Sequence, residues 1–124
     1  MIQIAVMPDL IRHPLALHIL VMPNQPCVYI LASGRHGTLY VGVTGHLIER
    51  IHQHRTTMMD GFTARHSVHR LVWFEYQADF PTAIALEKKL KKWRRDWKVS
   101  LIEKDNPFWE DRAIILGLPP LGSS

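Results

Sequence analysis

Two tyrosines, one arginine, one histidine and one glutamate are the side chains of this sequence best suited to chemistry. Tyr29 and Tyr40 stand eleven positions apart. Arg50 and His54 follow at a spacing of four, and Glu87 comes much later. A guanidinium stays charged and can grip phosphate oxygens through two parallel hydrogen bonds. A single carboxylate, completed by water and substrate phosphate, is a common way of holding Mg²⁺. Together these side chains predict reactions at a phosphate ester.

Each of these residues also has an ordinary explanation when it is taken alone. A tyrosine is often a core residue whose hydroxyl needs a partner, and an isolated arginine usually lies on the surface. Glu87 is spaced to pair with Lys91 one helical turn later. Gly42, two positions after Tyr40, weakens the ordinary reading, because a position without a side chain lets another backbone or a substrate phosphate approach closely.

The two tyrosines fall in two short runs typical of β-strands. Residues 28–32 and 38–43 are rich in β-forming side chains, and residues 33–37 between them are a cluster of turn formers. This pattern predicts a hairpin with a loop of about five residues. Thr44 is placed to cap a helix that follows at once.

The helix predicted over residues 47–54 has two distinct faces. Leu47, Ile48 and Ile51 form an apolar stripe that would pack on the hairpin. A second face carries His46, Arg50 and His54, which recur every four residues. We expect this second face to present a cation next to the tyrosines.

A third strand and a long helix complete the pattern. Residues 71–76 predict a largely buried strand, and Asp79 or Thr82 can begin the helix after it. That helix is predicted over residues 82–97, with one buried stripe made of Leu86, Leu90, Trp93 and Trp97. Residues 99–102 indicate a continuation or a second short helix. The order β-β-α-β-α-α predicts an α/β protein of the α+β kind, with a small three-stranded antiparallel sheet flanked by helices.

The 124 residues suffice for one domain with one core. We assign residues 27–116 to this domain. Residues 1–26 are interrupted by four prolines and are expected to form a peripheral N-terminal extension, and residues 117–124 a flexible tail.

Charge and cysteine usage bear on partners and compartment. Lys and Arg outnumber Asp and Glu by 15 to 11, and seven of the basic residues lie between positions 88 and 98. Such a face predicts a polyanionic partner, most simply nucleic acid, although a merely solvated helix face has the same composition.

The single cysteine, Cys27, excludes an internal disulfide. We expect it to be buried, in a protein of the reducing cytoplasm. No apolar run reaches the roughly 18–20 residues of a membrane span, so no membrane partner is expected. The histidine spacings do not predict a zinc site. The oligomeric state is left open.

The residues around the two tyrosines resemble a known family. Cys27-Val28-Tyr29 and Tyr40-Val41-Gly42 are similar to the two motifs of the GIY-YIG nucleases, with Arg50 at the family's helical arginine and Glu87 at its metal-binding glutamate. The likeness extends over about residues 26–112 and is greatest to small, single-domain bacterial members. The chain departs from the pattern at Cys27, which replaces a glycine, at the two valines, and at Val43, where some members have a lysine.

This resemblance implies a metal-dependent endonuclease that hydrolyses phosphodiester bonds of DNA and is structure-specific or related to DNA repair. Glu87 would hold a single Mg²⁺ or Mn²⁺, and Arg50 would stabilise charge on the phosphate. Tyr40, or failing that Tyr29, would orient or deprotonate water, while His54 would relay the proton or bind phosphate. The residues implied to bind substrate are Gly42, Lys88, Lys91, Arg94 and Asn106. Two other readings stay open: a nucleic-acid-binding module without turnover, and a protein-interaction domain.

Overall fold

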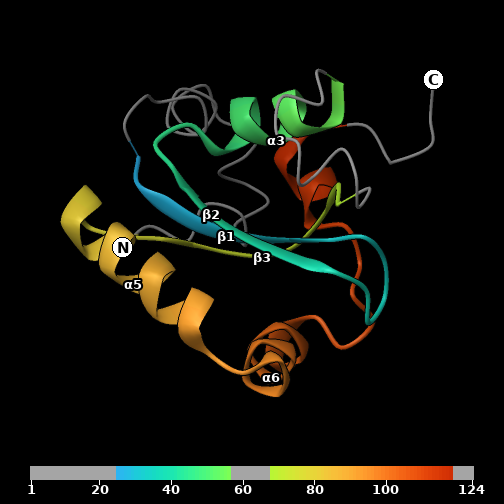
Figure 1. The fold of residues 1–124 in the computed structure, drawn as a ribbon. Coiled ribbons are helices and arrows are strands. Elements are labelled where there is room, and N and C mark those ends of the chain that lie inside the picture. Colours follow the sequence, from blue (N-terminus) through green and yellow to red (C-terminus); the bar gives the residue numbers. More distant parts are fainter. Residues whose placement is uncertain (1–24, 57–67, 119–124) are drawn as a thin grey trace.

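The computed structural model describes residues 25–56 and 68–118 (Figure 1). Its elements, in chain order, are β1 (Cys27–Ala32), β2 (Leu39–Thr44), α3 (Leu47–Thr56), β3 (Arg70–Tyr76), α5 (Phe80–Lys92), α6 (Arg95–Asp105) and the 3₁₀ helix η2 (Arg112–Leu116). The predicted α+β class and the β-β-α-β-α-α order are confirmed, and η2 is an addition that the sequence pattern did not predict. Most of the proposed N-terminal extension and of the C-terminal tail lies outside the described residues.

The sheet places both tyrosines on one face. Its strand order is β2-β1-β3, and β1 pairs antiparallel with both neighbours. Tyr29 of β1 stands opposite Gly42 of β2, and Leu31 stands opposite Tyr40. Because cross-strand partners point to the same side and alternate positions share a face, Tyr29, Tyr40 and Gly42 all face the same way. Since β2 pairs only with β1, it is an edge strand.

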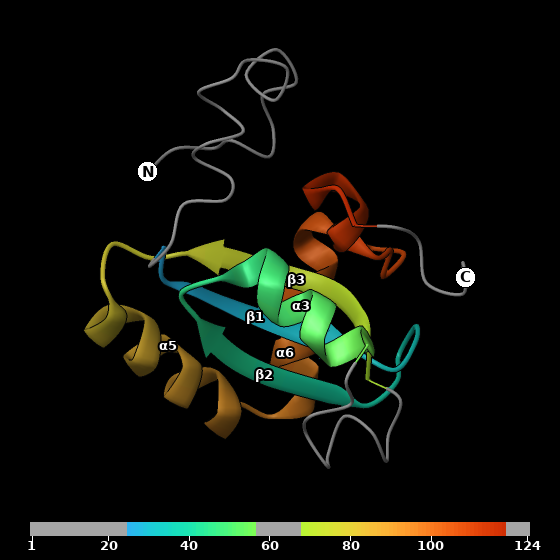
Figure 2. The same cartoon turned by 90° about the horizontal axis from the view of Figure 1, so that it is seen from above.

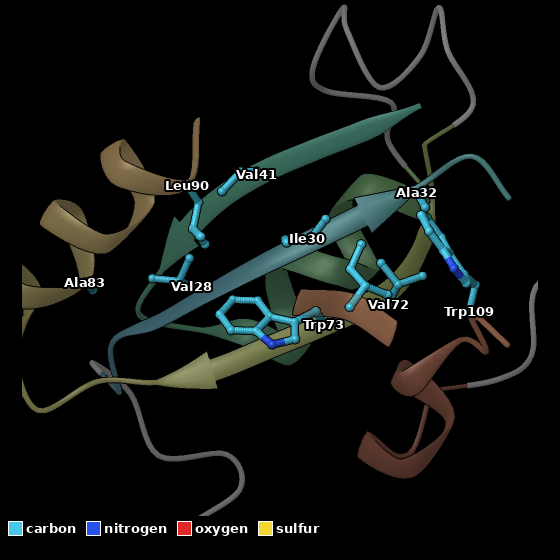
Figure 3. Packing of buried hydrophobic residues seen from close by; sticks show 10 residues of the cluster. Val28, Ile30, Ala32, Val41, Val72, Trp73, Ala83, Leu90 and Trp109 are labelled. Atoms are coloured by element: carbon cyan, nitrogen blue, oxygen red, sulfur yellow. The ribbon is translucent and has the colours of Figure 1, made fainter. Parts of the chain in front are cut away.

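Helices cover both faces of the sheet, as the two views in Figures 1 and 2 agree. On the face of the tyrosines, Leu47 and Ile51 of α3 and Ala113 and Leu116 of η2 join the buried cluster. On the other face, α5 and α6 contribute to a second cluster, whose sheet residues are drawn in Figure 3. Every residue of β1 is buried, as a central strand between two helical layers requires.

A bulge in β3 shapes the second cluster. Ile30 pairs with Trp73 but the next residue, Leu31, pairs with Leu71, so Val72 is the extra residue. Figure 3 shows Val72 and Trp73 in the same cluster, whereas strict alternation would send one of them to the opposite face.

Asn106 stabilises this bulge and is not placed to bind substrate. Its side chain is buried, and the residue is only 3% exposed. The amide nitrogen donates to the carbonyls of Val72 (3.1 Å) and Glu110 (2.9 Å), and the amide oxygen accepts from the Glu110 N–H (2.9 Å). With both donor and acceptor groups engaged by backbone, Asn106 has a structural role, and we correct its predicted role in substrate binding accordingly.

The predicted helix over residues 82–97 is wrong in its length. It begins as expected, because the Asp79 carboxylate accepts from the Thr82 N–H at 2.8 Å, a hydrogen bond that lowers the pKa of Asp79. It ends at Lys92, and the backbone of Trp93 and Arg94 is extended before α6 starts. The bend brings Ile102 of α6 into the buried cluster, so burial of a second helix overrides the continuous stripe.

Three local predictions concern the burial of Cys27, the cap at Thr44 and the absence of a membrane span. Cys27 is fully buried as expected, and burial raises the pKa of its thiol well above the ordinary value. The Thr44 hydroxyl accepts from the His46 N–H at 3.0 Å, which fixes the turn just before α3 rather than the first helical turn itself. Among the described residues, no helix has the length and apolar character needed to cross a bilayer.

A buried ion pair joins α3, β3 and η2. Arg55 donates from one terminal nitrogen to both oxygens of Asp111 at 2.7 Å, and these side chains are only 10% and 9% exposed. One Asp111 oxygen also accepts from the backbone N–H groups of Leu71 and Ala113. The Arg55 Nε donates to the carbonyl of His69. Three segments far apart in the sequence therefore meet at one carboxylate.

The structure predicts that Asp111→Ala lowers the free energy of unfolding by about 3–5 kcal/mol, because the buried guanidinium of Arg55 loses its carboxylate partner and the N–H groups of Leu71 and Ala113 lose their acceptor. Urea denaturation followed by circular dichroism measures this. Asp96→Ala is the matched control, since it removes the highly exposed Arg94–Asp96 pair and should cost at most about 1 kcal/mol. Equal losses in the two variants would contradict the assigned role of the buried pair.

Candidate active site

Three aromatic rings from three elements pack together at the predicted site. The hydroxyl of Tyr29, on β1, lies 3.1 Å from Nε2 of His54 on α3, a buried hydrogen bond whose donor depends on the imidazole tautomer. The ring of Tyr40, on β2, is centred 6.4 Å from that of Tyr29 and 5.5 Å from that of His54. Residues separated by up to 25 positions thus form one cluster.

Gly42 makes this cluster possible. A Cβ atom at position 42 would lie 2.5 Å from both Cζ and the hydroxyl oxygen of Tyr29, far inside van der Waals contact. The approaching group is therefore the phenol of Tyr29. This corrects the expectation that the open space above Gly42 serves another backbone or a substrate phosphate, and it makes Gly42 a packing partner within the site.

The three rings differ in their access to solvent. Tyr29 and His54 are each only 1% exposed, whereas Tyr40 is partly exposed. His54 lies on the helix face predicted to carry cations, but its ring is buried against the sheet, in contact with Tyr29. Of the three rings, Tyr40 is the one that reaches the molecular surface.

Arg50 lies one helical turn before His54 on α3, and a spacing of four places the two side chains on the same helix face. Arg50 is partly exposed. Within the described part of the chain, its guanidinium makes no hydrogen bond and no ion pair, so its fork of donors is available to an incoming anion. The structure therefore puts a cation on the element that carries His54.

Glu87 is not in this cluster. It lies on the same face of α5 as Ala83 and Leu90, which are fully buried in the cluster on the opposite side of the sheet. Its side chain is 13% exposed and forms an ion pair with Lys91, as the spacing of four predicts. Figures 1 and 2 show α3 and α5 on different faces of the sheet. α5 packs against the edge strand β2 as well as against β1, so β2 is the edge of the sheet nearest to the helix of Glu87.

The basic residues predicted to bind substrate lie on or next to α5. Lys88, Lys91 and Arg94 are all exposed. The Arg94 guanidinium pairs with Asp96 at 3.0 Å, but both side chains are so exposed that this pair is weak. These cations are thus positioned for contact with a partner in solvent, and Asn106, as described above, is not.

The residues present fit a divalent ion of the kind held by few protein ligands. Among residues 25–56 and 68–118, no group of three or more His, Cys, Asp or Glu side chains is placed to form a metal cage. Glu87 remains as a single, partly accessible carboxylate, which is the ligand set typical of Mg²⁺ completed by water and phosphate. Lys91 is 53% exposed, so exchanging it for an ion costs little.

Comparison with known proteins identifies one family. The family model described as the GIY-YIG catalytic domain matches residues 25–100. That range contains the ring cluster, Arg50 and Glu87, and it ends before Asn106. Neither the curated proteins nor the solved structures yield a match.

The close approach at Gly42 predicts that Gly42→Ala lowers the free energy of unfolding by about 1–3 kcal/mol, because the added methyl group overlaps the phenol of Tyr29. Denaturant titration measures this loss. Gly34→Ala is the control, since a Cβ atom there meets no atom within 4 Å, and it should change stability by less than about 0.5 kcal/mol.

A double-mutant cycle attributes this loss to its cause. In a Tyr29→Leu background the overlapping ring is absent, so adding Gly42→Ala should cost much less than it does alone, with a coupling of about 0.5–3 kcal/mol. Strictly additive effects of the two substitutions would show that Gly42 serves something other than the packing of Tyr29.

Proposed function

The chain belongs to the GIY-YIG catalytic-domain family, a family of nucleases, and from that premise we propose that it is a metal-dependent endonuclease hydrolysing phosphodiester bonds of DNA. The observation that carries the proposal is the cluster of Tyr29, Tyr40 and His54, with Arg50 one turn away on α3. Hydrolysis needs a base for the attacking water and a cation for the charge that grows on the phosphate. Tyr40 and Arg50 supply these two groups.

Tyr40 is the general base in this proposal. A free tyrosine has a pKa near ~10, so it needs a nearby positive charge to lose its proton at neutral pH. Arg50 on the neighbouring helix is one such charge, and a divalent ion held by Glu87 would be a second. Tyr29 is less suited to contact water directly, because it is buried and bonded to His54. The Tyr29–His54 pair instead packs against the ring of Tyr40 and orients it.

Arg50 stabilises the transition state in this proposal. Its guanidinium is always charged and presents paired donors to the non-bridging oxygens of the phosphate. As water adds to phosphorus, negative charge on those oxygens increases, so the same hydrogen bonds become stronger than they were with bound substrate. This difference is what lowers the barrier.

Glu87 would hold the divalent ion, Mg²⁺ or Mn²⁺. When bound, such an ion acts as a Lewis acid on the phosphate and stabilises the leaving 3′ oxygen. To bind the ion, Glu87 would release the ammonium of Lys91, and the partial burial of its carboxylate limits how far it can move. The proposal therefore includes substrate that lies across the edge strand β2 and reaches residues of both faces.

The basic surface of α5 would hold the DNA backbone. Lys88, Lys91 and Arg94 are exposed and can each neutralise a phosphate. Binding of this kind depends little on sequence and falls steeply with salt concentration. We extend the proposal to branched or damaged DNA as substrate and to action in the cytoplasm, where the single thiol of Cys27 stays reduced.

A second candidate function is a nucleic-acid-binding module of the same fold without turnover. It is favoured by the position of Glu87 on the opposite face of the sheet from the tyrosines, paired to Lys91. In that case the basic surface of α5 would bind DNA, and no divalent ion would bring about cleavage.

Nicking of supercoiled and branched DNA with Mg²⁺ or Mn²⁺ tests the proposal. We expect Arg50→Ala to lower the rate by about 10²–10³-fold, because it removes a donor to the developing charge. Tyr40→Phe should lower the rate by about 10²–10⁴-fold, because it removes the proton acceptor. Glu87→Gln should abolish metal-dependent nicking.

Glu110→Gln, which neutralises an exposed carboxylate outside the site, is the control and should retain the parent rate. Equal nicking by the parent and Glu87→Gln would mean that this site does not catalyse the reaction. Salt-sensitive binding that Glu87→Gln leaves unchanged, without cleavage under either metal, would establish the second candidate function.

A further inference from the structure

At the bend between α5 and α6, two indoles meet edge to face, and one of them is exposed. Trp97 is 51% exposed, an unusual fraction for so large an aromatic side chain, and Trp93 beside it is only half-buried. Their ring centres lie 5.7 Å apart, with the planes nearly perpendicular at 86°. Figure 1 shows that α5 and α6 meet below the sheet, on the face turned away from α3. We call this region, defined by Lys89, Trp93, Arg94 and Trp97, the elbow.

Cations lie against both indoles. The ammonium of Lys89 is 5.8 Å from the centre of the Trp93 ring, and the guanidinium of Arg94 is 5.5 Å from that of Trp97. Trp and Arg are enriched at protein–protein interfaces but Lys is depleted there, so this composition does not by itself indicate a protein partner. Alternating aromatic and basic side chains are instead the composition of surfaces that bind single-stranded nucleic acids.

A basic hollow lies next to the elbow. Its volume is about 300 Å³, and it is lined by Thr38 and Leu39 of the hairpin and by Arg95 and Lys98 of α6. Arg95 is held in place, because it donates to the carbonyls of His36 (2.8 Å) and Gly37 (2.7 Å). Among the residues that the structure describes, none of those lining the hollow is a carboxylate.

The two cations of the hollow disfavour each other. Partial burial and the charge of Arg95 both lower the pKa of Lys98. An anion between them would relieve this repulsion, and a phosphate has the charge and the acceptor oxygens to do so. Trp97 and Lys98 are consecutive, so the hollow and the exposed indole lie within one turn of the same helix.

We propose that the elbow binds an unpaired segment of nucleic acid, with a base stacked on Trp97 and a neighbouring phosphate held between Arg95 and Lys98. An unpaired base offers its face to an aromatic ring, whereas bases in a duplex are already stacked on one another. The inference rests on the proposed function only in taking nucleic acid as the substrate. It adds a substrate class: strands that carry a single-stranded arm, flap or gap beside the bond to be cut.

Binding measured without cleavage tests this inference. Fluorescence anisotropy of the full chain in EDTA would compare a dye-labelled oligothymidylate with a duplex of equal length. We expect Trp97→Ala to weaken binding of the single strand by about 5- to 150-fold, the range typical of losing one stacked base. Binding of the duplex should be unchanged, and Trp97→Phe, which keeps an aromatic face, should retain most of the affinity for the single strand.

The hollow is tested through the salt dependence. Replacing both Arg95 and Lys98 by Ala should reduce the slope of log K against log salt for the single strand by about 0.7, the value for one phosphate contact. Lys104→Ala removes an exposed charge farther along α6 and is the control, for which we expect the slope to stay unchanged. An unchanged slope in the double variant would exclude the hollow as a phosphate site.

Other outcomes overturn the proposal as a whole. If Trp97→Ala binds oligothymidylate as the parent does, or loses affinity for strand and duplex equally, the elbow does not recognise unpaired bases. Self-association that depends on Trp97, seen by light scattering without any affinity for nucleic acid, would assign the elbow to a second copy of the chain. Nicking by the parent with normal strand binding by Trp97→Ala would refute this inference alone, and Trp97-dependent binding without nicking would refute only the endonuclease.

Discussion

The hydroxyl of Tyr29 meets the imidazole of His54 in a space that exists only because residue 42 has no side chain. This contact links the central strand to its edge neighbour and to α3, and it decides which rings are buried. With Tyr29 and His54 filling the interior, Tyr40 is left at the surface, where a substrate can meet it. A larger residue at position 42 would displace the ring of Tyr29, which packs against the rings of Tyr40 and His54. Both the packing and the proposed chemistry therefore require glycine at this position.

The residues that the proposed function requires lie on opposite faces of the sheet. One face holds the aromatic cluster and Arg50, and the other faces α5 and α6 with their basic residues. Glu87 belongs to the second layer, so any joint action of the carboxylate and the tyrosines takes place around the edge strand β2. A substrate long enough to cross this edge would contact both layers at once. A nucleic-acid strand is such a substrate, and the elbow lies on the layer where its flanking part would pass.

Local sequence rules predicted the elements but not all of their ends. Alternation and turn residues placed the strands, and the hairpin loop set the register that brings the tyrosines to one face. The break after Lys92 could not be read from a regular apolar stripe, because it depends on burying Ile102 against a distant sheet. Asn106 resembled a substrate ligand for a similar reason: its partner is the carbonyl of a bulge at Val72, which no local pattern indicates. The order and spacing of the site residues could be recognised in the sequence, whereas their burial depends on tertiary packing and could not be predicted from it.

The central claim of the proposal is that the phenol of Tyr40 and the ion that Glu87 would hold act at the same phosphate, although the two residues belong to opposite layers. Paramagnetic broadening of side-chain NMR signals by substoichiometric Mn²⁺ measures this most directly, with Glu87→Gln as the reference. The account predicts that Mn²⁺ broadens the ring signals of Tyr40 together with the signals of α5 residues around Glu87, and that both effects vanish in Glu87→Gln. Broadening that is confined to α5, or that leaves the Tyr40 ring sharp while Glu87 binds the ion, would contradict it.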